Sequence, residues 1–115
     1  MNSQIKERWV RALRSGQYEQ TKGILHNNQG YCCLGVLCDL YAKEHDVEWQ
    51  EPHEDNSFYT MNGCGSTLPD VVVEWADVED TSPDVTFKGR VISLANLNDS
   101  GKTFDQIAQV IEENF

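Results

Sequence analysis

Residues 31–42 read YCCLGVLCDLYA, and this stretch decides how the rest of the chain must be arranged. It is too long and too apolar for a typical strand, while Asp39 and Lys43 lie four residues apart, as suits a helix. We therefore predict a mostly buried helix over residues 32–44, with Cys32, Asp39 and Lys43 on a narrow polar edge. Gly35 inside it costs about 1 kcal/mol relative to alanine, a cost that close packing would explain.

A second helical pattern opens the chain. Ser3 can cap a helix that ends near Ser15, and the apolar residues of this segment share one face. Arg8, Arg11 and Arg14 fall within one arc on the opposite face. The sequence thus predicts an amphipathic helix with a row of guanidinium groups on its polar side.

The remaining elements are shorter, except for the last. Thr103 and Gln106 have the spacing of a capping box, and apolar residues with helical spacing follow them. Lys88-Gly89 is the predicted turn of a small hairpin. Further short elements are expected in the segments 18–27, 47–49 and 58–61 as extended structure, from Pro69 to residue 76 as a helix, and from Ser93 to residue 97 as a single turn.

These elements predict an α+β fold, with three to four helices packed on a small, mainly antiparallel sheet. No repeat, linker or low-complexity tract interrupts the sequence, which predicts a single globular domain over residues 1–115. The charged first residues lack the apolar run of a signal peptide, so we expect a cytoplasmic location and no membrane contact.

Charge is distributed unevenly along the 115 residues. The net charge is −10, and the segment 44–87 holds twelve Asp and Glu residues but no Lys or Arg. Phosphate backbones repel such a chain, which argues against general nucleic-acid binding. The basic N-terminal segment is the exception.

The first candidate site is the arginine face. Guanidinium groups suit phosphate and carboxylate ligands, so a small anionic molecule such as a nucleotide would bind here. The predicted ligand-binding residues are Arg8, Arg11, Arg14, Tyr18 and Gln20. The competing interpretation is a solvated face, paired with the protein's own carboxylates.

The second candidate is the acidic segment, which could occupy a basic groove on another protein. Glu48, Glu51, Glu54 and Asp55 are its predicted interaction residues. A merely solubilising surface is the alternative.

The cysteines give a third candidate. Cys32 or Cys33 at a helix start would have a lowered thiol pKa, and His26 is the nearest histidine in the sequence that could act as its base. Free cysteines are, however, more often buried space-fillers. The spacing of Cys32, Cys33, Cys38 and Cys64 supports neither disulfides nor a zinc site, so no metal or other cofactor is expected.

Three segments carry a resemblance to a known group of proteins. They read WVRALRSGQYEQ at residues 9–20, YCCLGVLCDL at residues 31–40 and LANLNDSGKTF at residues 94–104. The chain resembles a family of small, mostly uncharacterised proteins encoded by tailed phages and prophages. This resemblance implies a setting, an infected bacterial cytosol, and no particular reaction.

The function expected in that setting is an accessory one. A non-enzymatic protein would bind and neutralise a host component, for instance as an anti-defence protein, through either the arginine face or the acidic segment. A cysteine-dependent hydrolase and a minor structural protein of the virion are the alternatives. The oligomeric state is left open by the sequence, and a homo-oligomer is possible.

Overall fold

The computed structural model of the protein describes residues 1–52 and 57–115. Its central element is helix α2 (Cys33–His45), which is buried along most of its length. The predicted range of 32–44 is therefore correct to within one residue. Gly35 permits the close packing that the sequence suggested, because a Cβ atom there would lie 1.8 Å from the carbonyl oxygen of Leu25.

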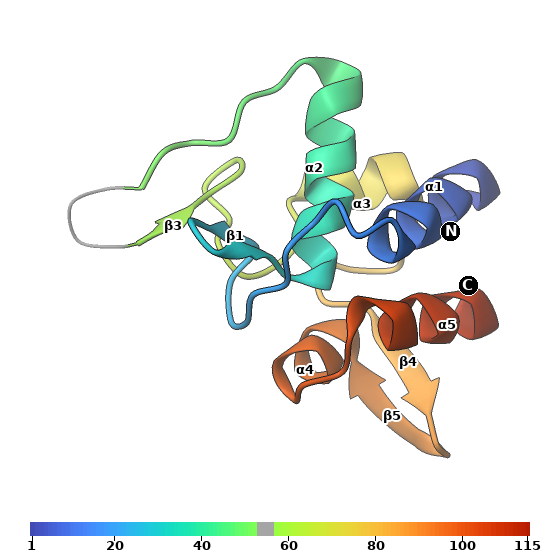
Figure 1. The fold of residues 1–115 in the computed structure, drawn as a ribbon. Coiled ribbons are helices and arrows are strands. Elements are labelled where there is room, and N and C mark those ends of the chain that lie inside the picture. The colour runs from blue at the N-terminus through green and yellow to red at the C-terminus, as the bar shows by residue number, and fades with distance from the viewer. Residues whose placement is uncertain (53–56) are drawn as a thin grey trace.

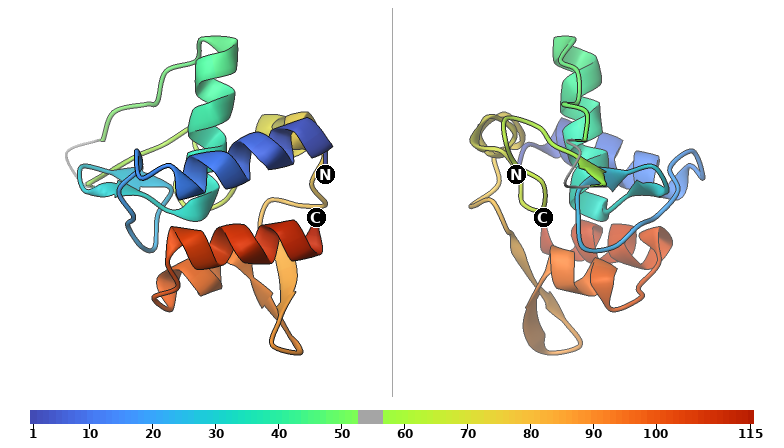
Figure 2. Two further views of the ribbon diagram at one scale, coloured as in Figure 1. Left: turned by 45° about the vertical axis from the view of Figure 1, so that its right-hand side comes forward. Right: turned by 90° about the vertical axis from the view of Figure 1, so that its left-hand side faces the viewer.

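Two further long helices lie side by side, next to α2. They are α1 (Ser3–Arg14) and α5 (Phe104–Asn114), and both views of Figure 2 show them adjacent, with the two termini on the same side. The cap of α1 is Asn2, whose side chain accepts from two backbone N–H groups, so Ser3 is the first helical residue rather than the cap. The predicted capping box of α5 is present. In the core, Trp9 donates its indole N–H to the carbonyl oxygen of Cys33 at 2.9 Å.

Two shorter helices complete the helical part. Helix α3 (Asp70–Ala76) follows Pro69 and packs against α2, and α4 (Leu94–Asp99) is capped by the Ser93 side chain. The expected single turn after Ser93 is thus a helix of six residues.

The strands form two separate antiparallel sheets instead of one. Strands β1 (His26–Asn27), β2 (Gly30–Tyr31) and β3 (Phe58–Tyr59) pair in the order β2-β1-β3, and β4 (Asp84–Phe87) pairs with β5 (Arg90–Ser93) as the predicted hairpin. Most of the segment 18–27 is irregular, and the segment 47–49 forms no strand; only Gln50 bridges to Thr60. The α+β class is confirmed, with five helices in the described part of the chain.

Buried Asn98 joins the half of the molecule that contains α4 and the β4–β5 hairpin to the half built around α2. Its side-chain oxygen accepts from the backbone N–H of Cys33 and from Gln20, and its amide donates to the carbonyl oxygen of Thr21. These contacts tie α4 to the start of α2. The C-terminal end of α2 and the tip of the β4–β5 hairpin lie at opposite ends of the molecule, as Figure 1 shows.

Among the described residues, no helix is both long and apolar enough to cross a membrane.

Candidate functional site

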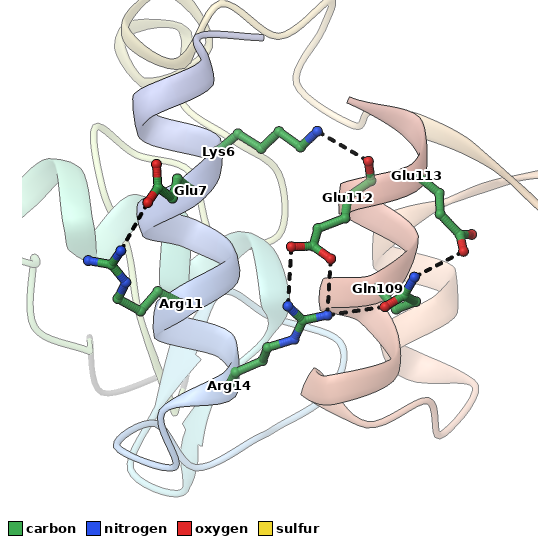
Figure 3. Close-up of polar contacts among 7 residues, drawn as sticks. All are labelled: Lys6, Glu7, Arg11, Arg14, Gln109, Glu112 and Glu113. Carbon is green, nitrogen blue, oxygen red and sulfur yellow. Dashed lines mark hydrogen bonds and ion pairs between the residues drawn. The ribbon is translucent and has the colours of Figure 1, made fainter.

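The groove between α1 and α5 contains two of the predicted arginines, and in Figure 3 both point to carboxylates. Arg14 reaches across the groove to Glu112 of α5, with a nitrogen–oxygen distance of 3.2 Å. Arg11 turns back to Glu7 of its own helix at 3.0 Å. The groove has a volume of about 420 Å³, but both of its guanidinium groups already have an anionic partner.

The other three predicted ligand residues lie elsewhere. Arg8 pairs with Glu44 of α2 at 2.9 Å. Tyr18 donates its hydroxyl to Asp39 at 2.6 Å, and Gln20 donates to Asn98 and to the carbonyl oxygen of Lys102. The five residues that the sequence grouped into one site are thus distributed over four places, because their partners come from α2, α4 and α5.

Asp39 is the centre of a polar network beside α2. This buried carboxylate accepts from Tyr18, from the indole N–H of Trp49 at 3.0 Å and from Lys43 at 3.1 Å. The hydrogen bond from Lys43 to Tyr18, followed by the contact with Asp39, raises the pKa of the Lys43 amine. Burial and the adjacent carboxylate raise the pKa of Tyr18. The network fixes Trp49, and with it the segment that carries Glu48, against α2.

His26, the predicted catalytic base, belongs to an aromatic stack. Its ring lies between those of Tyr31, at a centroid distance of 3.8 Å, and Tyr59, at 4.4 Å. Its Nδ1 atom lies 2.8 Å from the carbonyl oxygen of Gly30, an acceptor, so Nδ1 carries the hydrogen. The imidazole therefore holds the three short strands together.

The thiols near the start of α2 are buried, which reverses the expected direction of their pKa shift. Cys32 caps the helix by accepting from the backbone N–H of Gly35, and burial raises its pKa to about 11. Burial also raises the pKa of Cys33 and Cys38 well above the ordinary range. The helix dipole was expected to lower the pKa of Cys32 or Cys33, and this expectation is wrong because desolvation of the thiolate outweighs the dipole.

Among residues 1–52 and 57–115, no group of three or more His, Cys, Asp or Glu side chains lies close enough to hold a metal ion.

The acidic segment is only partly described. Glu48 and Glu51 are exposed, and they flank residues that are anchored: Trp49 bonds to Asp39, and Gln50 exchanges backbone hydrogen bonds with Thr60. The other two predicted interaction residues, Glu54 and Asp55, lie outside the described residues. Glu48 and Glu51 are therefore presented on an ordered segment.

A second surface, outside the interaction residues predicted from the acidic segment, lies at the C-terminal end of α2. Here Trp75 of α3 contacts Tyr41 at a centroid distance of 5.4 Å and His45 at 5.9 Å, with both ring pairs close to perpendicular. The Arg8 guanidinium lies 5.8 Å from the Trp75 ring. Glu44 accepts from the Trp75 indole and from Arg8. We call these five residues the Trp75 patch.

Exposed carboxylates lie close to the Trp75 patch residues in the sequence. Its aromatic rings are half-buried, and Glu44 and His45 are exposed. The hydrogen bond from Trp75, followed by that from Arg8, lowers the pKa of Glu44. Exposed carboxylates follow or flank the patch residues in sequence and form no ion pair within the described chain; this acidic rim consists of Asp46, Glu74, Asp77 and Glu79.

A weak signal for this patch is present in the sequence. Tyr41, Glu44 and His45 are spaced by three and four residues and so share one face of α2. The sequence could not show that the rings of Tyr41 and Trp75 meet at the edge of the core, with their other sides facing solvent.

Comparison with known proteins agrees with the extent of the fold. Residues 1–115 match the family described as a domain of unknown function, DUF8296. The chain belongs to this family. No curated protein and no solved structure matches it. The family covers every element described above, including the Trp75 patch and both sheets, and it assigns no activity to any of them.

Proposed function

We propose that this DUF8296 protein is a non-enzymatic binding protein that attaches to the basic surface of a host protein through the Trp75 patch and its acidic rim. The observation that carries this proposal is the composition of the surface. Trp, Tyr and Arg side chains meet in it, and exposed carboxylates without a cationic partner among the described residues adjoin these residues in the sequence. Trp, Tyr and Arg are the residue types that contribute most to binding energy in protein interfaces.

The two parts of this surface would have different roles. The carboxylates of the rim attract a basic partner over a distance and exclude acidic ones, which mainly affects the association rate. The rings of Tyr41 and Trp75 then lose their remaining contact with water, which mainly slows dissociation. Glu48 and Glu51 belong to a separate anchored segment, which is held to the Asp39 side of α2.

A bacterial host is proposed because of the resemblance of the three sequence segments to phage and prophage proteins. In that setting, an accessory protein that covers a basic groove of a host enzyme would block the access of nucleic acid or another anionic substrate. The buried thiols and the stacked His26 favour this binding role over a cysteine hydrolase.

The test compares matched variants of the immobilised protein in bacterial lysate. A specific partner is one that the wild type retains and that Trp75→Ala loses by about tenfold or more. Glu74→Gln with Asp77→Asn should weaken retention less, and raised salt should reproduce that smaller loss. The control is Gln109→Ala on α5, which removes no residue of the patch and should leave retention unchanged.

Two measurements make the outcome decisive. Circular dichroism and thermal unfolding show whether Trp75→Ala is folded, and the rim double variant tests the same surface without touching a ring. If the same proteins are retained by every variant, the proposal is wrong. If retention is lost with Arg11→Gln and Arg14→Gln instead, the α1–α5 groove is the binding site.

A further inference from the structure

The β4–β5 hairpin and the residues beside it carry cations that form no ion pair with the described part of the chain. Four of the nine Lys and Arg residues have carboxylate partners: Arg8, Arg11, Arg14 and Lys43. Lys88, Arg90 and Lys102 form no ion pair with any described residue. They lie around one pocket of about 460 Å³ between the hairpin and α4.

The pocket combines positive charge with an apolar floor. Phe87, Ile92 and Leu97 line it, and the ammonium groups of Lys88 and Lys102 lie 5.4 and 5.5 Å from the centroid of the Phe87 ring. Phe87 and Arg90 are paired across the hairpin and so share one face of it. Three cations therefore converge near one aromatic ring.

The local sequence contributes to this lack of ion pairs among the described residues. No Asp or Glu occurs between Val85 and Asn98. Asp99 follows, but its carboxylate accepts from the backbone N–H of Gly23 and from Asn98. In a chain with a net charge of −10, three such cations around one pocket would be neutralised most directly by an anion that binds there.

We propose that this pocket binds a small phosphate-bearing molecule with a planar ring, of the size of a nucleoside diphosphate. The phosphate oxygens would be bound by Lys88, Arg90 and Lys102. A cluster of Lys and Arg donors suits a multiply charged phosphate group better than it suits a single carboxylate. The ring of the ligand would pack on Phe87. The volume lies within the range of small-molecule sites. This site is independent of the Trp75 patch and lies at the other end of the molecule (Figure 1).

The experiment titrates the whole chain with three probes by calorimetry and by ¹H–¹⁵N NMR. The probes are ADP, which carries both the ring and the charge, inorganic pyrophosphate, which carries the charge alone, and adenosine, which carries the ring alone. ADP should bind about tenfold more tightly than either of the others, with shifts confined to residues 87–92 and 96–102. A second series with GDP, CDP and UDP shows which ring is preferred.

Variants separate the two contributions. Lys88→Gln with Lys102→Gln should weaken ADP and pyrophosphate binding by about tenfold or more. Phe87→Leu should weaken ADP alone, to the level of pyrophosphate. Lys22→Gln, which removes an exposed cation outside this pocket, is the matched control and should bind ADP as the wild type does.

Three outcomes would overturn the proposal. The first is that no nucleoside diphosphate binds at millimolar concentration. The second is that ADP shifts the resonances of the α1–α5 groove instead of the hairpin. The third is that a glutamate-rich peptide binds at the hairpin while the nucleotides do not, which would make the hairpin a docking surface for an acidic protein.

Discussion

The two ends of the molecule differ in the sign of the charged side chains that lack an ion-pair partner among the described residues. At the end of α2, the one nearby arginine, Arg8, is held by Glu44, and the carboxylates of the acidic rim have no cationic partner in the described chain. At the hairpin, the cations Lys88, Arg90 and Lys102 lack ion pairs with described residues, and Asp99, which follows the hairpin in the sequence, bonds to Gly23 and Asn98 instead.

This difference shows that net charge describes neither end well. A charge of −10 predicts repulsion of every anion, yet the Debye length at physiological salt is about 8 Å, so each end acts on ligands largely by its own local field. The principal extents of the chain, 41 × 27 × 25 Å, keep the two ends well beyond that distance. The same small protein can therefore present an acidic surface to one partner and a basic pocket to another.

The largest expected effect concerns the thiols of the core that both ends share. In the native protein, half-exposed Cys64 should react with iodoacetamide, whereas Cys32, Cys33 and Cys38 should react at least about a thousandfold more slowly, because they need an opening of the fold. Alkylation followed by mass spectrometry measures the four rates, and Cys64→Ser should remove the fast phase. A fast thiol that persists in Cys64→Ser would contradict the description of the core as inert and would favour a thiol enzyme.

The next effect concerns the joint between the two ends. Asn98→Ala should lower the free energy of unfolding by roughly 3 kcal/mol, since it leaves the buried N–H of Cys33 and the carbonyl oxygen of Thr21 without their partners. Urea unfolding measures the change. The exposed neighbour Asn96→Ala is the control, with an expected change below about 0.5 kcal/mol. Similar losses for both variants would mean that Asn98 does not join the two halves.

Alkaline pH should destabilise the α2 side, where the tyrosines with raised pKa lie, before it affects the hairpin. Burial, followed by the charge of Asp39, raises the pKa of Tyr31 to about 12. Below about pH 10 this phenol is neutral in both the folded and the unfolded chain, and between about pH 10 and 12 only the unfolded chain ionises. Stability should therefore fall across that window as the pH rises.

The matched variant for this prediction is Tyr31→Phe. It should reduce the fall in unfolding free energy by about 1 kcal/mol, less than the full pKa shift would give, because the half-buried phenol is partly screened by solvent. Urea midpoints of both proteins at about pH 9 and pH 11.5 give the difference. Cys32 titrates in an overlapping range in both proteins, so the comparison between them isolates Tyr31. An identical pH dependence of the two would contradict the prediction.

The smallest effects are those of the unpaired charges on stability. Glu74→Gln with Glu79→Gln changes the net charge from −10 to −8 and should stabilise the fold by at most about 0.5 kcal/mol at low salt. Lys88→Gln with Lys102→Gln makes it −12 and removes two cation–π contacts, so a comparably small loss is expected. Changes above about 1 kcal/mol for either pair would show that these charges are structural rather than available for binding.

Much of the fold could be predicted because its signals are local. The capping box of Thr103 and Gln106, the apolar spacing of the long helices and the Lys88-Gly89 turn each depend on residues a few positions apart. The turn, for example, needs two positive φ angles, and Lys88 and Gly89 have values of 52° and 77°. The strands were predicted less well, since β3 pairs with β1 although the whole of α2 lies between them in the sequence.

The sites could not be predicted in the same way, because a side chain's role depends on what the fold places beside it. Arg14 and Glu112 are 98 positions apart, and the sequence gives no reason to pair them. Cys32 lies at a helix start, as predicted, but only the packing around it shows that desolvation outweighs the dipole.

By itself, the sequence determined where the long helices begin and end, the α+β class and the segregation of charge along the chain. Only the tertiary structure decided which of those charges are paired, which aromatic rings meet at the surface as the Trp75 patch, and which cations remain around the hairpin pocket. The physical reason is range: capping, periodicity and turns act within about four residues, whereas ion pairing and desolvation depend on distances in space that the chain sets only when it folds.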